Sequence, residues 1–125
     1  MGYMGLKNWG AGDDAACTVH CIQDDMAKRL KVALKDKGNY CNPSGAVNVG
    51  LINESFIAPI AMQFRDADGL LEVLRKAHDS LADETVEAQK QSAAEWGGAS
   101  NRRMHITAYK RLLKSLEKSI RVIKK

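Results

Sequence analysis

The sequence predicts an all-α protein: a bundle of four to five helices preceded by an irregular N-terminal lead-in. Apolar residues recur at helical spacing in three long segments. There are only two prolines in 125 residues, and the connections between segments are short, as in helical bundles. The length corresponds to a single domain, residues 1–125, and the 45% hydrophobic content is enough for a modest core.

The first predicted helix begins at Asp13 or Asp14 and ends near Lys37. The first dozen residues are rich in glycine and predict an irregular lead-in, with Trp9 as an anchor. Aspartate is a preferred N-cap, and Gly38 is a typical residue just beyond a helix end. The apolar stripe that should face the core consists of Val19, Ile22, Met26, Leu30, Ala33 and Leu34.

The second segment, residues 42–64, is open to two interpretations. Asn42 followed by Pro43 indicates a helix start, with proline at the first helical position. An alternation of apolar residues fits a short strand equally well: Val47, Val49 and Leu51. We expect a helix, because a lone strand has no partner to pair with. Pro59 then marks a break or a new start.

The third predicted helix is capped by Asp66 or Asp68. It either continues to Trp96 or restarts at Asp83. Its inward stripe consists of Leu70, Leu71, Leu74, Ala77, His78 and Leu81.

The fourth predicted helix follows the glycine-rich turn "GGAS" at 97–100. Ser100 is the expected cap, and the helix extends from Asn101 to about Lys124. Its inward residues are Ile106, Tyr109, Leu112, Leu113, Leu116, Ile120 and Ile123. Because the turn is short, the last two helices should pack as an antiparallel pair.

Positive charge is concentrated at the C-terminal end of the chain. Residues 100–125 contain nine Lys or Arg and one Glu, a net charge of +8, whereas residues 1–99 carry a net −4. Six cations share the helix face opposite the apolar stripe: Arg103, Lys110, Arg111, Lys114, Lys118 and Arg121. We expect this face to bind a partner. The alternative is ion pairing within the chain, because residues 66–95 carry a net −5.

A cluster of thiols and an imidazole occurs near the start of the first helix. Cys17, His20 and Cys21 lie together on the side away from the apolar stripe. The Cβ atoms of Cys17 and Cys21 should lie about 5–6 Å apart, too far for a disulfide, which needs about 3.8 Å. Zinc bound by Cys17, Cys21 or His20, and Cys41 is conceivable, but the spacing matches no strong zinc signature. We therefore expect no metal and no cofactor.

No catalytic motif is present in the sequence. The turn "GGAS" follows a helix and lacks the lysine of a phosphate-binding loop, and there is no HExxH or nucleophile elbow. His78 and His105 lie on the stripes of two helices that should pair. They could therefore approach each other, or pair with Tyr109 or Glu72. We interpret both as buried histidines satisfied by one hydrogen bond, and we expect a non-enzymatic protein.

The stretch "NWGAGDDAA", residues 8–16, resembles the opening of a family of small bacterial and bacteriophage proteins of unknown function. Those proteins begin with a Trp-Gly element followed by acidic residues and alanine that enter the first helix. The matching residues are Trp9, Gly10, Gly12, Asp13, Asp14 and Ala15. The resemblance implies a bacterial or bacteriophage accessory protein and no particular activity.

These observations predict a small cytoplasmic protein that acts by binding another protein, in a regulatory or inhibitory role. The alternative is weak, sequence-nonspecific binding of nucleic acid through the basic C-terminal helix. No secretory signal is visible, and the apolar run from Phe56 to Met62 is too short to span a membrane. Self-association is a further expectation, based on apolar residues beyond what one bundle needs: Tyr3, Met4, Leu6, Trp9 and Trp96.

Overall fold

A computed structural model describes residues 11–39 and 42–125 of the chain. Within these residues the protein is all-α and 79% helical, which confirms the predicted fold class. The elements in chain order are α2 (Ala11–Leu34), α3 (Gly45–Ile52), the π-helix η1 (Asn53–Ile57), the 3₁₀ helix η2 (Ala58–Gln63), α4 (Leu70–Lys90), the short 3₁₀ helix η3 (Ala94–Trp96) and α5 (Ala99–Val122).

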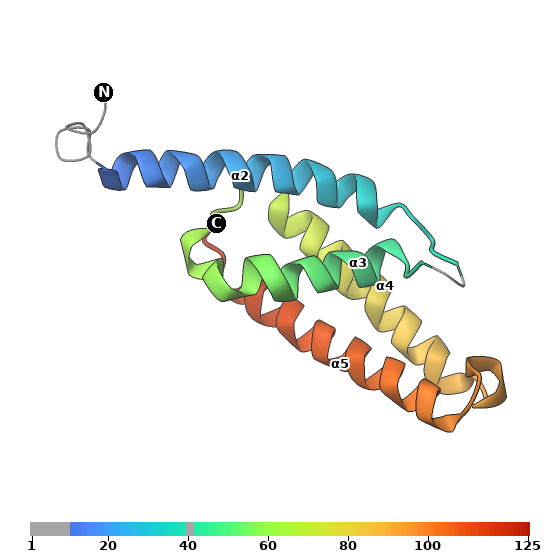
Figure 1. Cartoon of the computed structure of the whole chain (residues 1–125). Helices are drawn as coiled ribbons and strands as arrows, with labels where there is room; N and C mark the ends of the chain where they lie inside the picture. Colours follow the sequence, from blue (N-terminus) through green and yellow to red (C-terminus); the bar gives the residue numbers. More distant parts are fainter. Residues whose placement is uncertain (1–10, 40–41) are drawn as a thin grey trace.

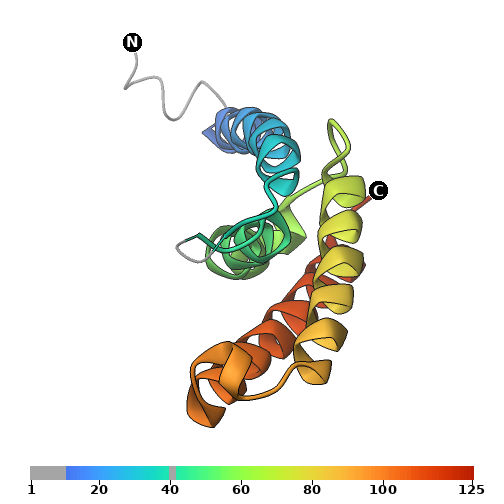
Figure 2. The same cartoon turned by 90° about the vertical axis from the view of Figure 1, so that its right-hand side faces the viewer.

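The helices pack around one core, with α2 at one edge of the molecule. Next to α2 lie α3, with its π and 3₁₀ extensions, and the start of α4, while α5 lies on the far side of α3 (Figures 1 and 2). The last two helices run antiparallel, as predicted (Figure 1). Leucines of α4 and α5 form the centre of the core and are fully buried: Leu70, Leu71, Leu74, Leu81, Leu112 and Leu116.

The ends of α2 differ from the prediction. The helix begins at Ala11, so Asp13 and Asp14 lie inside it and are not its caps. It ends at Leu34, three residues before Lys37, because the chain must turn there to bring α3 against it. A Cβ on Gly45 would lie 2.1 Å from the carbonyl oxygen of Ala33, which shows how closely the start of α3 approaches the end of α2.

The inward face of α2 is also rotated from the predicted stripe. Ile22 is 54% exposed, whereas Gln23, Ala27 and Leu30 are buried. The buried Oε1 of Gln23 accepts a hydrogen bond of 3.1 Å from the backbone N–H of Arg65. This contact with a distant segment helps to place Gln23 inside and Ile22 outside.

The second segment is helical and contains no strand, in agreement with our preference. Pro43 is not the first helical residue, however, because Ser44 is the N-cap and its Oγ accepts a hydrogen bond from the N–H of Val47. At the other end, η2 begins around Pro59, which lacks the N–H needed to continue an α-helix. Ile60 has φ −129° and ψ 25°, so the helix is kinked at this point.

The helix α4 is capped partly as predicted. The carboxylate of Asp66 accepts a hydrogen bond of 3.0 Å from the N–H of Leu71, although Gly69 occupies the N-cap position with φ +77°. The helix runs without interruption through Asp83 and ends at Lys90, well before Trp96.

The predicted start of α5 is also corrected, because Ser100 lies within the helix and is not its cap. The N-cap is Gly98, whose φ of +132° disfavours any residue with a side chain. The predicted inward stripe of α5 is confirmed. Ile106, Leu112, Leu116 and Ile123 are buried, and the other three members are partly buried against the core: Tyr109, Leu113 and Ile120.

One described stretch, Gly45–Gln63, is long and apolar enough to cross a membrane by length and composition alone, with a mean hydropathy of 1.2. It is longer than the apolar run from Phe56 to Met62 that the sequence analysis considered. Core helices of soluble proteins pass the same test, and 44% of this stretch is buried inside the fold. It is therefore weak evidence, and the absence of a membrane span stays a prediction.

Candidate functional site: the basic face of α5

The six cations predicted to share one face of α5 are all exposed in the structure. We call them the basic face: Arg103, Lys110, Arg111, Lys114, Lys118 and Arg121. From the first to the last the face is about 27 Å long, because an α-helix rises about 1.5 Å per residue. The opposite face of α5 lies in the core, and this burial holds the helix in one orientation with its cations outward.

Arg111 is the one member of the basic face with an ion pair among the described residues. Its Nε lies 2.6 Å from Oε2 of Glu54, and its Nη2 lies 3.2 Å from Oε1 of the same carboxylate. The hydrogen bond that Arg111 donates to the Glu54 carboxylate raises the pKa of the Arg111 side chain. The π-helix η1, which carries Glu54, therefore borders the basic face on one side.

The alternative, ion pairing between the basic face and the acidic segment 66–95, does not occur in residues 11–39 and 42–125. Helices α4 and α5 meet through their apolar stripes, and among the described residues no carboxylate of α4 forms an ion pair with any of the six cations. The side-chain charge contact between these two helices instead joins Nε2 of His78 to Oε1 of Glu117, at 3.1 Å. Glu117 borders the basic face on the side of α4.

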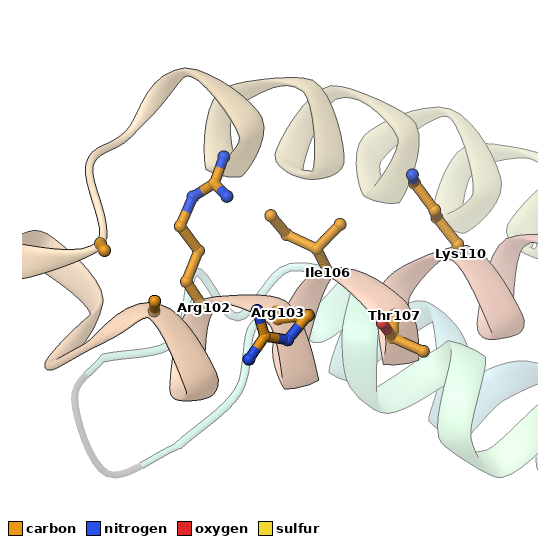
Figure 3. Close-up of a pocket in the computed structure, with 7 residues that line it drawn as sticks. Arg102, Arg103, Ile106, Thr107 and Lys110 are labelled. Atoms are coloured by element: carbon orange, nitrogen blue, oxygen red, sulfur yellow. The ribbon is translucent and has the colours of Figure 1, made fainter.

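A shallow hollow of about 300 Å³ lies at the N-terminal end of the basic face. Figure 3 shows Arg102, Ile106 and Lys110 extending from α5 toward α4, while Arg103 and Thr107 lie in front of the α5 ribbon. Ala93 and Ala99 complete the lining. Three cationic side chains therefore surround one small depression.

Arg102, which the sequence analysis did not assign to the site, has a structural role in this hollow. Its Nε donates to the carbonyl oxygen of Gln91 at 3.0 Å, and its Nη2 donates to that of Gln89 at 2.9 Å. These carbonyls lie at the C-terminal end of α4, where cations are stabilised by the helix dipole. The only feature of the sequence that could have indicated a role for Arg102 in the site is its position next to Arg103 in "NRR".

The two histidines of the α4–α5 pair do not approach each other. His78 contacts Glu117 and also lies 3.3 Å from the carboxylate of Asp79. His105 is twelve residues from Glu117 along α5, about 18 Å away. The pairing with Glu72, another of the possibilities, does not occur either, because Glu72 forms an ion pair with Lys76, and this contact lowers the pKa of Glu72.

His105 belongs to an aromatic cluster at the start of α5. Its ring centroid lies 5.0 Å from that of Trp96 and 6.4 Å from that of Tyr109, so of the three possibilities for the histidines the structure shows the contact with Tyr109. Its Nδ1 lies 2.8 Å from the carbonyl oxygen of Asn101. Burial, and then the charge of Glu84, raise the pKa of Tyr109. The cluster packs η3 against α5 and has no arrangement of nucleophile and base.

The residues considered for zinc are not gathered into one site. Cys17 and Cys21 are exposed, and Nδ1 of His20 lies 2.9 Å from Nη2 of Arg65. Cys41 lies outside the described residues. In the part of the chain that the structure describes, no group of three or more potential metal ligands occurs.

No protein-family model, curated protein or solved structure matches this chain. The resemblance of residues 8–16 to small bacterial and bacteriophage proteins therefore stays a prediction, and Trp9 and Gly10 lie outside the described residues. The basis for a functional proposal is the surface of the protein itself.

Proposed function

We propose that this protein acts by binding another protein, in a regulatory or inhibitory role, and that the basic face of α5 contacts an acidic segment of that partner. The observation that carries the proposal is that the cations of the basic face are exposed and mostly without an ion pair among the described residues. All six are exposed, and only Arg111 has an ion pair within residues 11–39 and 42–125.

Unpaired cations on one helix face repel each other. Residues 100–125 carry a net +8, and only Glu117 offsets the positive charge within this segment. An acidic partner would neutralise this charge and would be attracted over a Debye length of about 8 Å at physiological salt. Attraction of this kind raises the rate of association and favours partners of opposite charge.

The acidic borders of the face favour a protein over a nucleic acid duplex. The carboxylates of Glu54 and Glu117 lie on its two sides. A duplex seated on the face would bring phosphates close to these carboxylates. An acidic helix or an extended acidic segment would contact the cations without that repulsion.

The hollow at the N-terminal end of α5 offers a place for one acidic side chain of the partner. Arg103 and Lys110 line it, and Ile106 provides an apolar wall. Arg102 already donates two hydrogen bonds to backbone carbonyls, so it supplies mainly positive charge. We expect a glutamate or aspartate of the partner to insert here, with the rest of the acidic segment along Lys114 and Lys118.

The proposal is tested by capturing partners from the native host with the tagged protein and with a charge-reversed variant. The variant K110E/K114E/K118E removes three exposed cations from the basic face. The matched control K28E/K35E/K37E changes the net charge by the same amount at three exposed lysines of α2 and of the connection after it. We expect the wild type and the control to capture the same partner, and the face variant to lose it.

Nuclease treatment of the lysate separates the two classes of partner. A protein that remains bound after nuclease treatment is bound directly, and this is the expected result. If capture depended on intact nucleic acid, or if the control variant lost the partner equally, the proposal would be wrong.

Single-stranded nucleic acid is the second candidate, because a single strand is narrow enough to follow the face between its two bordering carboxylates. The cations suit phosphates, but this side of α5 carries no aromatic residue on which a base could stack. We therefore expect such binding to be weak and indifferent to sequence.

A further inference from the structure

The outer surface of α2 presents a second row of side chains besides the one that faces the core. Ile22 is 54% exposed and Val32 is 72% exposed. Between them lie Asp25 and Arg29, whose side chains are 64% and 80% exposed. With 100° per residue, these four positions fall within a sector of about 80° on the helix.

The spacing of this row is that of a coiled-coil seam. Positions 22, 25, 29 and 32 are separated by three, four and three residues, the a and d positions of a heptad repeat. The order along the row is apolar, acidic, basic, apolar. A helix with such a seam on its outer surface is suited to pack against another helix.

We propose that two copies of this protein associate through α2, with their α2 helices antiparallel about a two-fold axis at the level of residue 27. Such an axis places Ile22 of each copy opposite Val32 of the other. It also places Asp25 of each copy opposite Arg29 of the other. A two-fold interface must be complementary to itself, and this row meets that requirement at all four positions.

An apolar groove beside the row provides the contact area that the row alone lacks. It has a volume of about 400 Å³ and lies between α2 and the second segment. Its floor and walls include Met26, Leu30, Ile52 and Phe56, and Phe56 is 64% exposed. Apolar side chains of the second copy would enter this groove and remove Ile22 and Phe56 from water.

The charges of the molecule favour a second copy as the occupant. Asp25 and Arg29 make the row neutral, whereas the chain as a whole carries a net +4. The basic face lies on α5, which is separated from α2 by α3 (Figure 1). Two copies in contact through α2 therefore direct their basic faces away from each other. An acidic partner would have no net electrostatic attraction to this neutral row.

The test exchanges the two charges of the row. D25R and R29D each bring like charges together at both central positions of the interface. We expect the wild type to form a dimer in the micromolar range by sedimentation equilibrium. Each single variant should weaken dimerisation about tenfold or more. The double variant D25R/R29D should restore it, because opposite charges face each other again.

Mixing the two single variants gives the most specific result. In a heterodimer of D25R with R29D every central position again pairs opposite charges, so the mixture should dimerise when neither protein does so alone. Within each copy Arg29 already lies 2.9 Å from Asp25, an exposed ion pair that the single variants also disrupt. The matched control is K76E, which disrupts the similarly spaced and exposed ion pair Glu72–Lys76 of α4 and should leave association unchanged. Far-UV circular dichroism checks that every variant is folded.

Three results would overturn the proposal. A wild type that stays monomeric throughout the micromolar range would exclude the dimer. A dimer that neither single variant weakens would place the interface elsewhere. Failure of both the double variant and the mixture to restore dimerisation would exclude the antiparallel arrangement.

Discussion

The guanidinium of Arg111 donates two hydrogen bonds to the carboxylate of Glu54, joining the outer side of α5 to the π-helix η1. The two residues are 57 positions apart in the sequence. This contact occupies one of the six cations of the basic face and helps to hold the irregular second segment in place. It therefore links the candidate site to the least regular part of the fold.

The pair should stabilise the protein only modestly, since its side chains are 56% and 31% exposed. We expect a double-mutant cycle of Arg111→Ala and Glu54→Ala to give a coupling energy of about 0.2–1 kcal/mol at low salt, decreasing as salt is added. Urea unfolding of the four proteins measures it. A coupling energy that is zero at low salt would mean that the pair does not form in solution.

Two glycines of α3 should respond differently to alanine. In G45A the new Cβ would meet the backbone of Ala33 and Leu34 at 2.1–2.6 Å, and a backbone cannot easily move away. We expect a loss of about 1–3 kcal/mol or more in the free energy of unfolding.

G50A is the matched control for this loss. Its Cβ would lie 3.3 Å from the side chain of Leu112, which can shift slightly, and alanine gains helix propensity of about 1 kcal/mol over glycine. The two terms should nearly cancel. Equal losses for the two variants, measured by denaturant unfolding, would contradict the close approach of α2 and α3.

The aromatic cluster should make stability depend on alkaline pH. Burial raises the pKa of Tyr109 above its ordinary value of 10.0, so the folded protein keeps the phenol proton to higher pH than the unfolded chain does. The stability that protonated Tyr109 contributes is fully present below that value and is lost as pH rises through the raised pKa.

The variant Y109F isolates this effect, because other tyrosines and lysines titrate equally in both proteins. The difference in unfolding free energy between wild type and Y109F should be constant up to about pH 9 and change in favour of Y109F above about pH 10. A difference that stays constant through this range would show that Tyr109 is not buried in solution.

Nucleic acid binding, if it occurs, should be electrostatic. Contacts to about three to five phosphates would give a plot of log affinity against log salt with a slope of about −3 to −4.5 for duplex DNA. Fluorescence anisotropy with unrelated oligonucleotides measures both the slope and the preference for sequence. K110E/K114E/K118E should abolish binding, while K28E/K35E/K37E retains most of it.

Two results would decide against this description of the basic face. Tight, sequence-selective binding that persists at high salt would place recognition on another surface. Absence of binding even at low salt would leave the acidic protein as the remaining partner.

The amino-acid sequence by itself determined the helical class, the approximate start of α4, the approximate extent of α5, and the separation of the cations of α5 from its apolar stripe. These features depend on interactions between residues three or four positions apart, which periodicity records directly. The stripe of α5 is confirmed for this reason. The predicted first residues of α2 and α5 differed by a few positions from the observed ones, Ala11 and Ala99. Neighbouring residues differ little in their preference for a helix terminus, so the sequence alone does not fix the exact end.

Only the tertiary structure decided which side of α2 faces the core and which acid pairs with Arg111. Gln23 is inside because it bonds to Arg65, and Glu54 meets Arg111 because η1 packs on α5. Both contacts join residues more than forty positions apart. No local pattern encodes such distances, since they arise only when separate helices pack together. The exposed row of α2 follows from the same packing, because the burial of Gln23, Ala27 and Leu30 turns Ile22 and Val32 toward solvent.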